Sequence, residues 1–134
     1  MEYTKITPNL IVKDVSASLK FYADVLNLPS AISVPEQPPF VFASVAAGAI
    51  EIFFNQQAHV AAEPGDFAQE FAGRPIGGSF TMFIEVEGIE EIMARVRQHK
   101  ARIVMPLQEM FYGMREFAFL DPDGYIITIA ERIK

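Results

Sequence analysis

The spacing of apolar residues predicts a strand, a helix and further strands in the first half of the chain. Residues 6–12 alternate as a strand does, and the apolar residues from Val15 to Leu26 then recur at the period of one helical face. Asp14 or Ser16 is expected to cap this helix. Two more apolar strands are expected after a Pro-rich segment, over residues 40–45 and 49–55.

The second half repeats this order. A strand is expected over residues 79–86, and the apolar stripe from Ile89 to Val96 predicts a helix with acidic residues in its first turn and basic residues near its last. Three strands are expected to follow, over residues 102–105, 114–120 and 125–133, with a turn at residues 121–124. A shift of 74 residues places Val12 on Val86, Val15 on Ile89 and Thr7 on Thr81.

The repeat predicts an α+β protein made of two tandem βαβββ modules. At 134 residues the chain has the length of one domain, with module one over residues 1–55 and module two over residues 79–134. Residues 56–78 are predicted to be a linker that carries a short helix near residues 67–72.

The amino-acid composition disfavours or excludes several classes of function. The net charge of −6 disfavours binding to nucleic acid, because that needs a surface that neutralises phosphates. The absence of Cys excludes disulfides, Cys-ligated zinc and thiol nucleophiles. We find no apolar run long enough to span a membrane and no targeting segment at the N-terminus, so we expect a cytoplasmic protein without a membrane partner.

Two motifs carry a family resemblance. The first, TPNLIVKDV at residues 7–15, and the second, YGMREFAFLDPDG at residues 112–124, resemble bleomycin-resistance proteins of the vicinal oxygen chelate superfamily, which also includes glyoxalases and ring-cleaving dioxygenases. The resemblance implies a curved mixed sheet around a cleft. It also implies a homodimer whose clefts are lined by both chains, with exchange of the N-terminal strand as a possibility that Pro8 favours.

The resemblance locates the metal positions of the superfamily. Metal-dependent members place a His in the first strand of each module and a Glu in the last strand, and the matching positions here are Thr7, Thr81 and Thr128. Neutral hydroxyls are poor ligands for divalent ions, so we expect no metal and no other cofactor. His59 and His99 lie outside the strands of the cleft and are interpreted as solvated.

Strand alternation predicts which side chains face the cleft. If Thr7 and Thr81 point inward, the cleft face also takes in Asn9, Ile11, Phe83, Glu85, Ile126 and Thr128. Glu131 then faces the opposite side. Such a face suits an aromatic or organic ligand, with Glu85 as the nearest partner for a cationic group; the alternative is that Phe83 and Ile126 fill a closed core.

The resemblance also assigns roles to aromatic residues. Phe40 and Tyr112 fall where resistance proteins stack aromatic side chains on a planar drug, although packing at a dimer seam is an alternative. Arg115 and Glu116 are either ligand contacts or a structural ion pair, and we favour the ion pair. Asn27 and Lys100 follow the helices at positions where the family has Gly in the left-handed conformation.

These observations favour a metal-independent binding protein. The predicted function is sequestration of a planar cationic or aromatic compound, such as a bleomycin-like antibiotic. The chain lacks the parts of a catalytic triad, a phosphate-binding loop or a metal triad, so an enzyme is the less favoured interpretation. The alternatives are a glyoxalase-like lyase or isomerase, or a dioxygenase-related enzyme, with a non-standard site, and a ligand-binding regulatory module.

Overall fold

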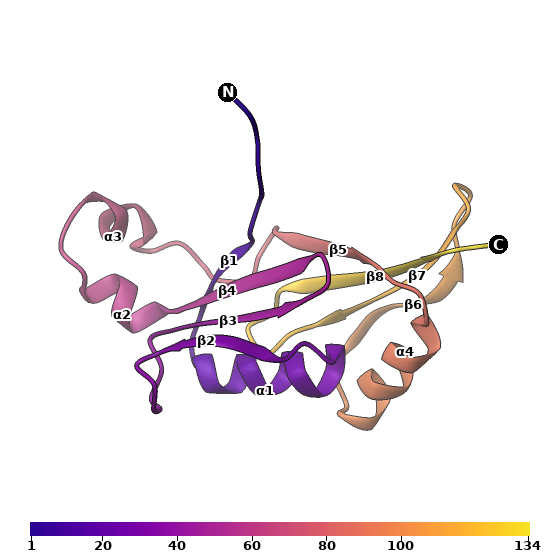
Figure 1. The fold of residues 1–134 in the computed structure, drawn as a ribbon, viewed down its shortest axis with the longest axis horizontal. Coiled ribbons are helices and arrows are strands. Elements are labelled where there is room, and N and C mark those ends of the chain that lie inside the picture. Colours follow the sequence, from indigo (N-terminus) through magenta and orange to yellow (C-terminus); the bar gives the residue numbers. More distant parts are fainter. The chain divides into compact units, whose positions relative to one another are not determined.

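A computed structural model describes all 134 residues and divides them into two units. The first comprises Met1–Ala23 and Asn27–Arg74, and the second comprises Asp24–Leu26 and Pro75–Lys134. Each unit contains one four-stranded mixed sheet, as the α+β prediction requires (Figure 1).

The first unit follows the predicted order. Its elements are β1 (Asn9–Val12), most of α1 (Val15–Leu26), β2 (Ser30–Val34), β3 (Phe42–Ala47), β4 (Ile50–Gln56), α2 (Gln57–Ala62) and α3 (Asp66–Phe71). The sheet order is β1-β4-β3-β2, with β1 parallel to β4 and the other pairs antiparallel. This is a βαβββ module.

Helix α1 covers one face of the first sheet. The Asp14 side chain caps it by accepting a hydrogen bond from the backbone N–H of Ala17 at 3.3 Å, which confirms one of the two predicted caps. Tyr22 is fully buried, and its ring centroid lies 4.9 Å from that of Phe54 on β4. The helix ends at Asn27, whose φ of 55° is in the left-handed region.

The second unit repeats the module. Its elements are β5 (Thr81–Glu85), α4 (Ile89–Gln98), β6 (Ile103–Glu109), β7 (Met114–Leu120) and β8 (Ile126–Arg132), in the sheet order β5-β8-β7-β6. β5 is parallel to β8, and the other pairs are antiparallel. Buried residues of α4 and of one sheet face form the core: Ile89, Met93, Val96, Phe117, Phe119, Ile127 and Ile129.

The turn between β7 and β8 forms as predicted. One oxygen of Asp121 accepts hydrogen bonds from the backbone N–H groups of Asp123 at 2.9 Å and Tyr125 at 3.0 Å. Gly77 packs closely against this turn, since a Cβ atom there would lie 2.7 Å from the carbonyl oxygen of Asp123. The turn therefore fixes both the β7–β8 register and the segment that leads into β5.

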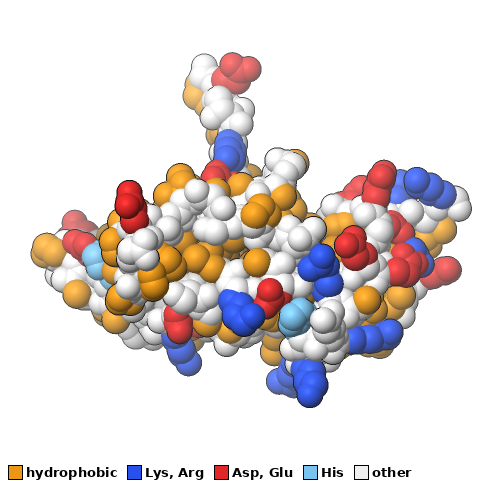
Figure 2. All heavy atoms as spheres, turned by 60° about the horizontal axis from the view of Figure 1, so that its bottom comes forward, with side chains coloured by type: hydrophobic (Ala, Val, Ile, Leu, Met, Phe, Trp, Pro, Cys, Tyr) orange, Lys and Arg blue, Asp and Glu red, His pale blue; other side chains and the backbone are white.

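The first predicted strand begins later than expected. It starts at Asn9 rather than at residue 6, because sheet pairing begins where the Pro8 carbonyl accepts a hydrogen bond from the Phe53 N–H at 2.9 Å. The N-terminal residues project from the first unit (Figures 1 and 2), and Tyr3 and Ile6 are each 92% exposed.

Two further elements were not predicted. Strand β2 carries mostly exposed side chains, so it lacks the apolar alternation of a half-buried strand. The linker contains two short helices rather than one: α2 is additional, and α3 covers the predicted helix. Neither α2 nor α3 has a buried residue, which explains the weak sequence signal.

Candidate functional site

The sheet face opposite α4 gathers most of the predicted ligand contacts of the second unit. In the strand register, Phe83 of β5 lies beside Thr128 of β8, and Thr128 lies beside Ala118 of β7. Thr81 is two residues before Phe83 and shares its face. The predicted alternation is thus confirmed for these residues.

This face combines an exposed aromatic ring with neutral hydroxyls. Phe83 is 56% exposed, although a ring of this size is usually buried. Thr81 is exposed and Thr128 is half-buried. The three side chains can offer apolar contact and neutral hydrogen bonds, and none of them brings a charge.

Glu85 lies at the end of the same row but is partly neutralised. Its carboxylate lies 3.9 Å from the guanidinium of Arg132, and its side chain is 55% exposed. A solvated carboxylate with a cationic neighbour attracts a further cation only weakly. Glu85 is therefore a weaker candidate for charge recognition than its position in the sequence suggests.

Glu116 is the buried carboxylate of this face. It lies beside Ala130 on β8, which in turn lies beside Glu85 on β5. Glu116 is 3% exposed and accepts a hydrogen bond from the hydroxyl of Tyr112. That hydrogen bond raises the pKa of Tyr112, because it and the nearby negative charge both disfavour the phenolate.

The expected ion pair between Arg115 and Glu116 is wrong. Consecutive residues of a strand point to opposite faces, so Arg115 lies on the α4 side of the sheet. There it pairs with Glu131 at 2.7 Å and with Glu90. A structural role is thus correct for Arg115, whereas Glu116 belongs to the face of the candidate site. The sequence signal that could have shown this was strand alternation, which places Glu116 on the same sheet face as Thr128.

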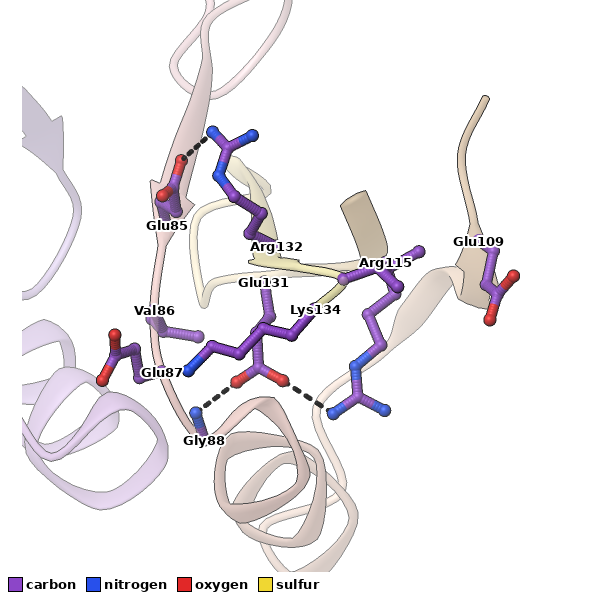
Figure 3. Close-up of a pocket in the computed structure, with 10 residues that line it drawn as sticks. Glu85, Val86, Glu87, Gly88, Glu109, Arg115, Glu131, Arg132 and Lys134 are labelled. Atoms are coloured by element: carbon purple, nitrogen blue, oxygen red, sulfur yellow. Dashed lines mark hydrogen bonds and ion pairs between the residues drawn. The ribbon is translucent and has the colours of Figure 1, made fainter. Parts of the chain in front are cut away.

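A recess lined largely by charged side chains lies where β5 and β8 end in the second unit, with a volume of about 580 Å³ (Figure 3). Glu131 lies within it and accepts hydrogen bonds from the N–H groups of Gly88 and Ile89, the latter at 3.1 Å. These bonds and the Arg115 guanidinium lower the pKa of Glu131 to about 2. Glu131 therefore caps α4, and its predicted orientation away from Thr128 is confirmed.

The first unit has a comparable polar and aromatic face. On it, the Asn55 side-chain amide donates a hydrogen bond to the Asn9 side-chain oxygen at 2.6 Å. The rings of Phe42 and Phe53 meet edge to face with centroids 5.2 Å apart. Ser44 lies beside Phe53, and its buried hydroxyl has no hydrogen-bond partner. Only Asn9 of these residues was predicted as a ligand contact.

The remaining predicted contacts lie on connecting segments. Thr7 is half-buried before β1, and Phe40 is half-buried between β2 and β3 in the first unit. Tyr112 lies at the tip of the β6–β7 hairpin of the second unit and is 46% exposed. These three contacts stay predictions.

The side chains that usually bind metal ions do not gather at one place in this chain. No group of three or more His, Cys, Asp or Glu side chains is arranged to hold a metal ion. His59, interpreted from the sequence as solvated, lies 3.1 Å from the carboxylate of Glu63 one turn later in the chain.

No helix is both long and apolar enough to cross a membrane.

Two βαβββ units in tandem, each with a helix over one sheet face, define the glyoxalase/bleomycin-resistance fold. The family described as the Glyoxalase/Bleomycin resistance protein/Dioxygenase superfamily matches residues 5–129, and the chain belongs to this superfamily. No curated protein matches the chain significantly.

Solved structures share the fold at low sequence identity. TioX from Micromonospora sp. ML1 is 17% identical with a TM-score of 0.75, and the match covers 98% of this chain and 100% of TioX. A virulence protein from Salmonella typhimurium is 24% identical with a TM-score of 0.70, covering 99% and 100%. A glyoxalase/bleomycin resistance protein/dioxygenase from Nocardioides is 18% identical with a TM-score of 0.75, covering 100% and 86%.

Proposed function

We propose that this protein binds a planar aromatic compound without the help of a metal ion and thereby sequesters it. The observation that carries the proposal is the exposed ring of Phe83, which lies beside Thr128 and shares a sheet face with Thr81. An exposed ring beside neutral hydrogen-bonding groups suits stacking and orientation of a flat ligand.

The same threonines support binding rather than metal-assisted chemistry. Thr7, Thr81 and Thr128 occupy the positions that the family resemblance assigns to two His ligands and one Glu ligand. A threonine hydroxyl is a weak ligand for a divalent ion but a good hydrogen-bond partner for an organic molecule. Antibiotics of the bleomycin type, which combine planar rings with cationic groups, belong to the proposed ligand class.

We also propose that the functional state is a homodimer formed through the N-terminal segment. Residues 1–7 leave the first unit with Tyr3 and Ile6 almost fully exposed. Lys5 holds this segment to the unit by an ion pair with Glu51, which is exposed and therefore weak. A second copy of the chain would bury both apolar side chains.

Calorimetric titration tests the proposed function. Purified protein is treated with a chelator, analysed for bound metals, and titrated with N-methylacridinium, uncharged acridine and bleomycin. We expect saturable binding of at least one compound by the chelator-treated protein. If none of the three binds, or if binding disappears with the chelator and returns with a divalent metal, the proposed function is refuted.

A further inference from the structure

The second unit holds a buried carboxylate that its own side chains leave incompletely paired. We propose that Glu116 is the charge-recognition residue of the ligand site, and that a cationic group of the ligand takes the place of the Tyr112 hydroxyl on its carboxylate. This inference rests on the proposed function and names the residue that selects the charge of the ligand.

The carboxylate of Glu116 has room for a further hydrogen-bond partner. The residue is 3% exposed, and the Tyr112 hydroxyl is the one side-chain hydrogen bond to its carboxylate. An ionised carboxylate has about four acceptor positions, so a single neutral donor satisfies only part of its capacity. Burying an ionised group is unfavourable unless it is paired and hydrogen-bonded.

The nearby cations of the unit are engaged elsewhere. Arg115 lies on the opposite face of β7, where it pairs with Glu90 and Glu131. Arg132 shares the face of Glu116 in the strand register, but its guanidinium is directed toward Glu85. The negative charge of Glu116 therefore has no cationic side chain paired with it, and a ligand can supply the missing charge.

The position of Glu116 fits a ligand that also stacks on Phe83. Phe83 and Glu116 lie on β5 and β7, with β8 between them. Two strand spacings give about 10 Å, and the two-residue offset of Glu116 from Ala118, the residue level with Phe83, extends the separation to roughly 12 Å, which a three-ring aromatic molecule stacked on Phe83 can span. On this face Glu116 has two small neighbours, Ala118 and Ala130, and two longer ones, Met114 and Gln108.

Tyr112 is placed to release the carboxylate. It is 46% exposed at the hairpin tip, between Phe111, which is 99% exposed, and Gly113, which has a φ of 85°. An exposed tip is the part of a hairpin that moves at the least energetic cost. The Tyr112 hydroxyl thus satisfies Glu116 before the ligand arrives, and its ring is then free to stack on the ligand.

Paired probes test the inference. N-methylacridinium and acridine have nearly the same shape, and in alkaline buffer only the first is charged. We expect wild-type protein to prefer the cation. Glu116→Gln should weaken N-methylacridinium binding by about tenfold or more, the effect of losing a charged contact of about 1.4 kcal/mol, and leave acridine binding nearly unchanged. The control Glu109→Gln removes an exposed carboxylate from β6 and should change neither affinity.

A second variant covers the case in which Glu116→Gln fails to fold. Tyr112→Phe keeps the ring and removes the competing hydroxyl, so the affinity for N-methylacridinium should rise. An unchanged or lower affinity overturns the inference, as does an equal loss of both probes in Glu116→Gln. If wild-type protein binds both probes equally well, the inference fails and the proposed function stands; if neither probe nor bleomycin binds, both fail.

Discussion

Replacing Lys100 with glycine should stabilise the protein. Lys100 follows α4 and has a φ of 56°, and the turn is closed by a hydrogen bond from the Ala101 N–H to the Val96 carbonyl at 3.1 Å. In this region the Cβ atom of an L-residue approaches the following carbonyl oxygen, which costs about 1–2 kcal/mol. The Lys100 side chain is exposed and makes no ion pair that would offset this cost.

The magnitude follows from two opposing effects. Removing the steric cost gains about 1–2 kcal/mol, and the greater freedom of glycine in the unfolded chain returns roughly 0.5–1 kcal/mol of it. Lys100→Gly should therefore raise the free energy of unfolding by about 0.5–1 kcal/mol, which corresponds to a rise of roughly 2–4 °C in Tm for a chain of this size.

The internal repeat supplies a matched control. Asn27 ends α1 with a φ of 55°, and Asn adopts the left-handed conformation more readily than Lys. Asn27→Gly should therefore gain only a few tenths of a kcal/mol. Urea unfolding of the wild-type protein and both variants measures the difference. The reasoning is refuted if Lys100→Gly is no more stable than wild type, or if Asn27→Gly gains as much.

Three further predictions follow from the ion pairs, the candidate site and the N-terminal segment. The folded pKa of Glu131, about 2, lies below its ordinary value of 4.5, so its contribution to stability is present above that value and is lost as the pH falls toward 2. The stability difference between wild type and Glu131→Gln should therefore shrink over this window. Phe83→Thr keeps a good strand-forming residue but removes the ring, so it should weaken acridine binding by about tenfold or more with little change in Tm, and unaltered binding would exclude stacking on Phe83. Light scattering should show a dimer that becomes monomeric on deletion of residues 1–7, and a wild-type monomer at micromolar concentration would contradict the proposed assembly.

Much of the fold was predictable because its elements bury regular apolar patterns. Both long helices carry a buried stripe, and β7 and β8 carry buried residues on the face under α4. Strand β2 and helix α2 bury little, so no periodic signal marks them. The start of β1 depends on a backbone hydrogen bond to Pro8, and side-chain patterns do not report such a bond.

The sequence predicted which residues share the face of the candidate site, but it did not predict how the charged residues of the site pair. Alternation, applied to the positions that the family resemblance points inward, placed Thr81, Phe83 and Thr128 on one face. Because Arg115 and Glu116 are adjacent in the sequence, we expected an ion pair between them, although consecutive residues of a strand point to opposite faces. The contact between Tyr112 and Glu116 depends on the hairpin turn bringing Tyr112 back over β7, and that geometry requires the structure.

Under the proposed function, the two units offer different chemical groups to the ligand. The first offers aromatic rings and amides without a buried charge on the corresponding face: Phe42, Phe53, Asn9 and Asn55. The second adds the buried carboxylate of Glu116 to its ring and hydroxyls. Stacking on a neutral ring can therefore draw on either unit, whereas preference for a cation must come from the second. Substitutions at Phe53 should accordingly leave the preference for N-methylacridinium over acridine unchanged, because the only buried glutamate stays in place.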